Sequence, residues 1–249
     1  MKRTERHHLK ENDFAEWLLG VTTWFETNRQ TVLYGGIAIL LIGAGVAGTV
    51  VYRQIDAGRA SGMLAEAMSV AEAPVLPPSP AEAGKAPVQQ PGSYPTDRAR
   101  LEAALPKLMA VADAYPGTDA GIMARYRAAS ALVAVGKTAE GVQRYREVVE
   151  QGRGVYQIMA RLGIADAQLA AGQFEQAIAS YKEAAALNSE EAPADGILMQ
   201  LARAYRLAGK ADEAKKTLKR VTDEYPQSPY APVAKRELES AGASTMATR

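Results

Sequence analysis

Three stretches of the chain share one pattern and decide the fold: ALVAVGKTAEGVQRYREV (131–148), AQLAAGQFEQAIASYKEA (167–184) and AYRLAGKADEAKKTLKRV (204–221). Each stretch holds one glycine between two helical runs. These glycines are Gly136, Gly172 and Gly209, separated by 36 and 37 residues. Glycine readily adopts the left-handed conformation that ends a helix. The pattern therefore predicts three helical hairpins, each with a helix A before the glycine and a helix B after it.

The side chains around each glycine also repeat. A small residue follows five positions after the glycine, and a bulkier residue comes four positions later. The small residues are Gly141, Ala177 and Ala214, and the bulkier ones are Tyr145, Tyr181 and Leu218. Helix A carries a matching small residue at Ala129, Ala165 and Ala202. Small side chains let two antiparallel helices touch, and the bulkier side chain fills the space beside the contact.

These residues resemble the tetratricopeptide repeat, a helix–turn–helix unit of about 34 residues. Three units are expected over about 119–228, with Pro226 at the end of the last one. The chain departs from the family pattern by its longer period, by the lack of tryptophan in the repeats and by Gly141 where alanine is usual. The extra residues fall between units.

A further half-repeat precedes the three units. The segment ADAYPGTDAGIMAR (112–125) parallels TDEYPQSPYAPVAK (222–235) at a constant offset of 110 residues. Residues 97–115 are therefore expected to form a helix B that is kinked or thinned at Pro106, with residues 54–73 as its helix A. Residues 230–241 are expected to cover the apolar face of the last repeat.

The N-terminal part of the chain predicts a membrane anchor. Residues 31–52 carry no charge, and 22 helical residues at about 1.5 Å each match a hydrocarbon core of about 30 Å. A cleaved signal peptide is the alternative, but the apolar run is longer than usual and about thirty polar residues precede it. An uncleaved signal anchor fits better.

The basic residues give the expected orientation. Five precede the span (Lys2, Arg3, Arg6, Lys10 and Arg29) and two follow it closely (Arg53 and Arg59). An excess of Lys and Arg marks the cytoplasmic side. The N-terminus is therefore expected in the cytoplasm, with the C-terminal domain exported.

An amphipathic helix is expected just before the span, with Asn12 as its N-cap. Its apolar face recurs every three or four residues and comprises Phe14, Trp17, Leu18, Val21, Trp24 and Phe25. Tryptophan favours the membrane–water boundary, so Trp17 and Trp24 are expected to contact lipid. A short helix that packs on a partner protein is the alternative.

Within the span, small residues recur at four-residue spacing and suit close packing against another helix. These residues are Gly43, Ala44, Ala47 and Gly48.

The sequence thus predicts an all-α protein: one N-terminal transmembrane helix followed by a tetratricopeptide-repeat α-solenoid. The expected segments are 1–30 (cytoplasmic tail with the interfacial amphipathic helix), 31–52 (transmembrane helix), 53–73 (juxtamembrane helix), 74–96 (proline-rich loop), 97–241 (tetratricopeptide-repeat domain) and 242–249 (polar tail). Seven of the thirteen prolines lie in 74–96, which disfavours helix there.

Composition argues against catalysis. The chain has no cysteine, and its two histidines are both at the N-terminus, at His7 and His8. The remaining chain lacks the commonest general base, nucleophile and soft metal ligand. Lys and Arg number 29 against 28 Asp and Glu, which gives no basic field for nucleic acid. We expect no enzyme activity, metal, cofactor, small-molecule substrate or nucleic-acid partner.

A helical solenoid offers protein binding along its inner face, which the A helices line. The residues expected there are Met123, Tyr126, Arg127, Met159, Leu162, Asp166, Met199, Gln200, Arg203 and Arg206, with Ser130 beside them. The three methionines form either an adaptable apolar strip for varied segments or filler between repeats. Both interpretations remain open from sequence.

The order of segments, together with the phrase YPGTDAGIMARYRAA (115–129), resembles a bacterial group described as ancillary subunits of the SecYEG translocon. Its helix-end part, YPGT (115–118), has the form YP-x-[ST], which is also shared with periplasmic repeat domains of outer-membrane assembly and the Tol–Pal system. The resemblance implies a single-pass inner-membrane protein with a periplasmic domain. Its expected partners are translocon subunits, exported chains or a periplasmic chaperone. Two hypotheses follow: an adaptor for protein export, or a structural scaffold of a cell-envelope complex.

Overall fold

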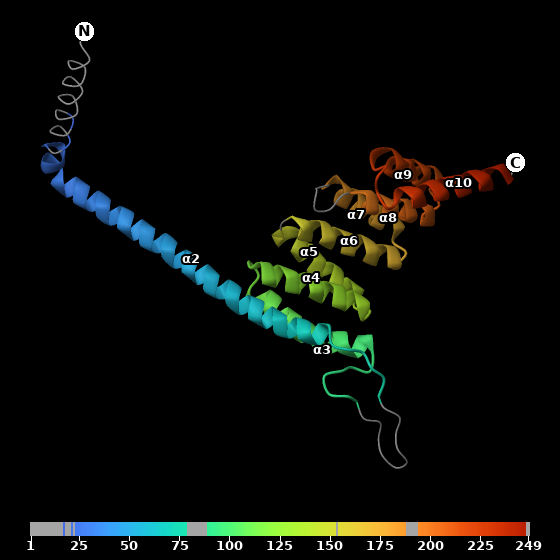
Figure 1. Ribbon diagram of the computed structural model, residues 1–249, viewed down its shortest axis with the longest axis horizontal. Helices are drawn as coiled ribbons and strands as arrows, with labels where there is room; N and C mark the ends of the chain where they lie inside the picture. Colours follow the sequence, from blue (N-terminus) through green and yellow to red (C-terminus); the bar gives the residue numbers. More distant parts are fainter. Residues whose placement is uncertain are drawn as a thin grey trace, which may run out of the picture. The chain divides into compact units, whose positions relative to one another are not determined.

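The structure is a computed structural model that describes residues 17, 21, 23–78, 89–152, 154–187 and 194–247 (Figure 1). Its helices are α2 (Arg29–Ala71), α3 (Asp97–Ala114), α4 (Asp119–Ala134), α5 (Thr138–Gln151), α6 (Val155–Ala170), α7 (Phe174–Ala186), α8 (Ala194–Leu207), α9 (Ala211–Glu224) and α10 (Ala231–Ala247). The chain divides into two compact units, Met1–Ile55 and Asp56–Arg249. The predicted all-helical solenoid is confirmed, and it occupies the second unit.

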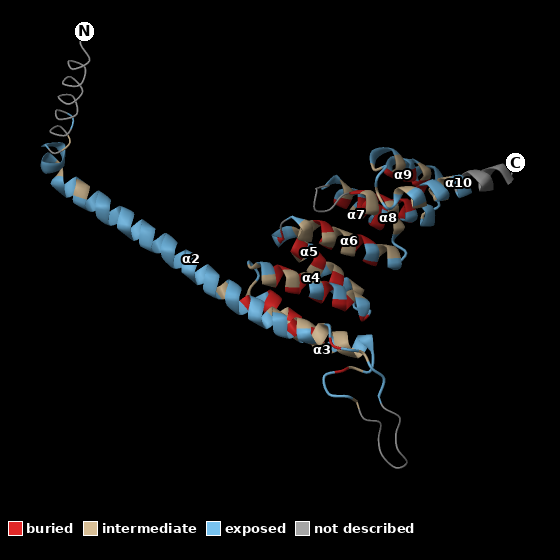
Figure 2. Cartoon of the chain, in the orientation of Figure 1, coloured by how far each residue is buried: buried red, intermediate tan, exposed pale blue. Residues whose placement is uncertain are grey.

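Helix α2 contains the apolar segment and continues beyond it. By length and composition it could cross a membrane: its most apolar window has a mean hydropathy of 2.0, and none of that window is buried (Figure 2). Residues 31–52 and 53–73 were expected as two segments, but one helix runs without interruption to Ala71. Gly43, Ala44, Ala47 and Gly48 are exposed along it.

Before α2, residues 23–27 are helical and Asn28 forms a turn that separates them from α2. Trp17, Trp24 and Phe25 are exposed, and the rings of Trp24 and Phe25 meet edge to face at 5.6 Å between centroids. Asn12, Phe14, Leu18 and the basic residues before Arg29 lie outside the described residues. The interfacial position of this segment stays a prediction.

The three predicted helix-ending glycines have the left-handed backbone that their role requires. The φ angles are +88° at Gly136 and +73° at Gly172 and Gly209. In the first hairpin the Gly136 N–H donates to the Val133 carbonyl at 3.0 Å, and the Lys137 N–H donates to the Leu132 carbonyl at 2.8 Å. The same pair of bonds recurs at the other two glycines. This arrangement is the Schellman motif, which satisfies carbonyls left open at a helix end.

The small residues lie where helix A meets helix B. A Cβ added to Gly141 would lie 2.8 Å from the Ala129 carbonyl oxygen and 2.6 Å from Val133 Cγ2. The contact between α4 and α5 is therefore too close for alanine at position 141. This closeness explains why the first unit has glycine where the tetratricopeptide pattern has alanine. Ala177 and Ala214 are buried at the same place in the next two hairpins.

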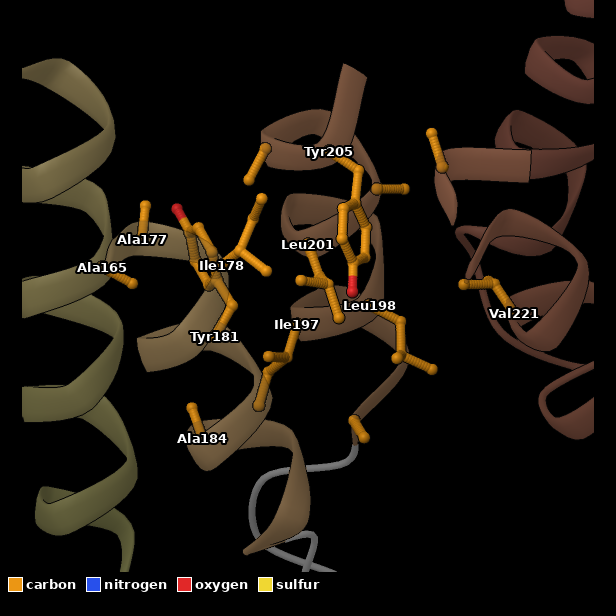
Figure 3. Packing of buried hydrophobic residues seen from close by; sticks show 14 of the residues in the cluster. Ala165, Ala177, Ile178, Tyr181, Ala184, Ile197, Leu198, Leu201, Tyr205 and Val221 are labelled. Atoms are coloured by element: carbon orange, nitrogen blue, oxygen red, sulfur yellow. The ribbon is translucent and has the colours of Figure 1, made fainter. Parts of the chain in front are cut away.

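The hairpins stack in chain order, each helix contacting the next, with α4 also contacting α6. Buried residues gather where these helices face one another (Figure 2). One core cluster joins α4, α5 and α6 through residues that include Ala129, Tyr145 and Ile164. A second, larger cluster joins helices α6 to α10 (Figure 3). We call these the first and second core clusters.

The predicted half-repeat is present as the end of α2 packed on α3. Leu64, Ala67 and Met68 of α2 join one buried cluster with Ala104 and Leu108 of α3. Helix α3 continues through Pro106 as a single helix. It ends as α9 does: the cap residues Tyr115 and Tyr225 have φ, ψ of −130°, 53° and −128°, 57°.

Arg125, in the shared phrase, joins three helices and was not anticipated from sequence. Its side chain is buried in α4, and Nη2 donates to the Ala112 carbonyl at the end of α3 at 2.7 Å. Nη1 donates to Gln151 of α5, and Nε lies 3.3 Å from a Glu147 oxygen. The guanidinium satisfies an open carbonyl and pairs with a carboxylate, as a buried charge must.

One predicted boundary in the C-terminal part differs from the structure. Helix α10 was expected to end at 241 with a polar tail over 242–249, but it continues to Ala247. Alanine-rich residues 241–247 have helical propensity, which outweighs their polarity.

In the proline-rich loop, residues 79–88 lie outside the described residues. Its base is held by a bridge between Val75 and Tyr94, with the Leu76 N–H donating to the Tyr94 carbonyl at 2.9 Å.

The glycine caps can be tested with Gly172→Ala. A Cβ in the left-handed region costs about 1–2 kcal/mol, so the midpoint of urea unfolding should fall. The measurement is circular dichroism at 222 nm on the full chain in a non-ionic detergent.

The matched control is Gly62→Ala in α2, where φ is not positive and an added Cβ meets no atom within 4 Å. Alanine favours a helix interior over glycine by about 0.5–1 kcal/mol, so this variant should be as stable as the wild type or more so. Equal midpoints for Gly172→Ala and the wild type would contradict the assigned cap.

Candidate functional site

A groove of about 580 Å³ lies between the A helices α4 and α6, and we call it the α4–α6 groove. The described residues that line it are Tyr126, Ser130, Val133, Ala134, Tyr145, Met159, Leu162, Gly163, Asp166, Ala167 and Ala170. On α6 these residues recur at three- and four-residue spacing, which places them on one helix face. Tyr145 comes from helix B of the first repeat, so three helices build the groove.

Gly163 makes room for the Tyr145 ring. A Cβ at position 163 would lie 2.4 Å from Tyr145 Cζ, and 2.7 and 2.8 Å from the two Cε atoms. The ring therefore lies flat against the backbone of α6, and it is only 4% exposed. It packs in the first core cluster with Ala129 of α4 and Ile164 of α6. Tyr145 thus connects all three helices at the bottom of the groove.

Tyr126 extends the aromatic surface. Its ring centroid lies 5.5 Å from that of Tyr145 and 6.4 Å from that of Tyr156, in tilted arrangements that favour aromatic pairs. Burial raises the pKa of both Tyr126 and Tyr145 above the ordinary value for tyrosine. Both phenols are therefore protonated at neutral pH and serve as hydrogen-bonding groups on apolar rings.

Asp166 provides the charge. Among the described residues that line the groove, it is the only Asp, Glu, Lys or Arg, and it is exposed. The Tyr181 hydroxyl, from helix α7, donates a hydrogen bond to Asp166 Oδ1. Burial, with this bond and the nearby negative charge, raises the pKa of Tyr181. The Tyr181 side chain is fully buried (Figure 3). Its hydrogen bond therefore ties the Asp166 carboxylate to the core of the solenoid.

The structure brings together four of the predicted inner-face residues: Tyr126, Met159, Leu162 and Asp166 all line the groove. Ser130, expected beside them, lines it too. Met159 lines the groove, whereas Met199 packs against the second core cluster. The position of Met199 fits the interpretation as filler between repeats, and the role of Met159 as part of a binding strip stays a prediction.

The other predicted residues lie outside the lining. Met123 is half-buried, and Arg127, Gln200 and Arg203 are exposed. Arg206 pairs with Glu237 of α10, with 3.1 Å between nitrogen and oxygen. Sequence reasoning missed Tyr145 and Gly163. The signal for Gly163 was present, because it follows Met159 by four residues on the same face of α6.

Comparison with known proteins supports the repeat assignment. Residues 168–235 match the tetratricopeptide repeat family. This match covers the second and third hairpins from the end of α6 onward. No curated protein matches the sequence.

Solved structures similar to the chain include the nearly identical TPR-like repeats of a kinesin light chain-like protein from Podosopora anserina, and a point variant of the same protein. Each is 20% identical, with a TM-score of 0.49, and the alignment covers 57% of this chain and 77% of the other.

The packing at the bottom of the groove can be tested with Gly163→Ala. The added methyl group overlaps the Tyr145 ring, and overpacking of this kind costs about 1–3 kcal/mol. Urea unfolding of the full chain in detergent should show the loss.

The double variant Gly163→Ala with Tyr145→Leu separates this clash from a general effect of the substitution. Leucine lacks the ring atoms that the methyl group meets, so the added cost of Gly163→Ala should largely disappear in the Tyr145→Leu background. Equal costs in both backgrounds would contradict the contact.

Proposed function

We propose that this protein is a membrane-anchored, protein-binding adaptor that receives extended polypeptide segments in the α4–α6 groove. The groove is the observation that carries the proposal. It is open, it lies along the A helices, and its surface combines apolar side chains with a few hydrogen-bonding groups. Binding sites with such a surface gain affinity from apolar contact and orientation from the polar groups.

The groove residues suit binding to varied segments. Met159 is flexible and polarizable and adapts to different apolar side chains. Tyr126 presents a half-buried ring, and Leu162 adds an aliphatic side chain that also packs against the second core cluster. These contacts need no single partner sequence, which is the property that an adaptor for unfolded or exported chains requires.

The anchor gives the proposed location. The apolar part of α2 serves as an uncleaved signal anchor, and the basic residues before it favour a cytoplasmic N-terminus. The solenoid is then periplasmic at a bacterial inner membrane. The partners that follow from this location are translocon subunits, exported chains or a periplasmic chaperone. Trp17 and Trp24 contact lipid at the boundary, and the small residues of the span pack on a neighbouring helix.

A photo-crosslinking residue at Met159 tests the adaptor proposal in intact inner membranes. Polypeptides in transit and translocon subunits, identified by mass spectrometry, should be captured from this position. The matched control is Arg146, which is exposed on α5 and lines a different pocket. Crosslinks of equal yield from both positions, or a solenoid shielded from protease in spheroplasts, would contradict the proposal.

A structural scaffold of a cell-envelope complex is the second candidate function. The observation that favours it is the fixed base of the proline-rich loop. Val75 pairs with Tyr94, and the Arg100 guanidinium donates to the Ala73 carbonyl at 3.3 Å. A loop held at both ends of its base can present its prolines to a partner as a spacer.

Deletion of residues 79–88 separates the two functions, because the paired base and the groove are retained. The scaffold predicts that the deletion abolishes partner capture in membranes. The adaptor predicts that crosslinking from Met159 continues at the wild-type yield. The yield of the Met159 crosslink, with and without the deletion, is the measurement.

A further inference from the structure

We infer that the α4–α6 groove prefers segments in which one lysine or arginine stands among aliphatic or aromatic residues, with the cation placed against Asp166. This inference rests on the proposed function and specifies its ligand. It follows from the charge of the groove, from how Asp166 is held, and from the rings around it.

The described lining residues of the groove include one acidic side chain and no basic one. This side chain is Asp166, and the ion pairs found among the described residues do not include it. Other acids of the solenoid do pair: Asp113 with Arg144 at 2.9 Å, and Glu175 with Lys210 at 2.6 Å. Asp166 instead accepts a hydrogen bond from the Tyr181 phenol, so no basic side chain of the described residues pairs with its carboxylate.

Asp166 is also held in place for a ligand. The bond from the buried Tyr181 hydroxyl restricts its rotamer, so less side-chain entropy is lost when a cation binds. The carboxylate is exposed on the groove side. A carboxylate fixed by a neutral donor and open to the groove is a ready partner for an ammonium or guanidinium group.

The surrounding side chains suit a long basic residue. Leu162 stands one turn and Met159 two turns before Asp166 on α6, and both offer apolar surface for a methylene stem. The ring of Tyr126 offers a face for the cation itself. Arg127 and Arg203 lie close enough to act on the pKa values of Tyr126 and Tyr181, yet neither lines the groove. Asp166 is the one acidic side chain among the described lining residues, so the groove offers a partner for one cation.

The test compares three labelled nine-residue peptides that are identical except at the central position: lysine, norleucine or glutamate among Leu, Val and Phe. Binding to the full chain in a neutral detergent is measured by fluorescence anisotropy. The lysine peptide should bind about fivefold more tightly than the norleucine peptide, as expected for an exposed ion pair, and the glutamate peptide should bind most weakly.

Asp166→Asn should remove the preference for lysine over norleucine. The amide oxygen still accepts from Tyr181, so the fold is kept. Asp212→Asn is the matched control: it removes the same charge from an exposed residue in the first turn of α9, outside the groove, and should keep the preference.

Equal affinities for lysine and norleucine in the wild type, or a lysine preference that survives Asp166→Asn, would overturn the inference while the groove remained a binding site. Failure of all three peptides to bind would overturn the proposed function as well. The two failures are therefore distinguishable.

Discussion

The close contact between helix A and helix B of each hairpin is the constraint on which the solenoid depends. At Gly141 the two backbones approach until a methyl group would overlap Ala129 and Val133. Two helices that touch this closely form a thin layer, and such layers stack with their A helices side by side. The α4–α6 groove exists because α4 and α6 are neighbours in that stack.

The absence of a side chain also shapes the groove, at Gly163. Gly163 lets Tyr145, a residue of helix B, reach through to the surface formed by the A helices. The solenoid thus uses one glycine to bring two helices together and another to admit an aromatic ring between layers. Both glycines act through volume rather than through backbone conformation, unlike Gly136, Gly172 and Gly209. The hairpin contact and the groove therefore have one physical cause, the absence of a Cβ where other atoms approach the helix backbone.

Most of the fold could be predicted from the sequence, because a cap glycine, a small residue and a bulkier residue recur at fixed offsets in each hairpin. The end of α10 was missed, because Ser244 and Thr245 suggested a polar tail although alanines stand beside them. Four site residues on α4 and α6 were predictable from helix periodicity. Tyr145 was expected only to fill the space beside the contact between helix A and helix B. It also lines the groove, and this position depends on the absence of a side chain at Gly163. The partners of Asp166 and Arg125 required tertiary structure, because they come from other helices.

The groove lies across the boundary between the two core clusters. Its bottom is Tyr145 of the first cluster, and its side includes Leu162, which packs against the second. Solenoid repeats interact mainly with their neighbours, so adjacent parts can open separately. A segment that binds along the groove contacts residues of both clusters, so its binding free energy opposes the opening of either one. A solenoid with a segment bound in the groove would then unfold more cooperatively than a solenoid with an empty groove. The affinity for that segment would set how strongly the unfolding of one core cluster is coupled to the unfolding of the other.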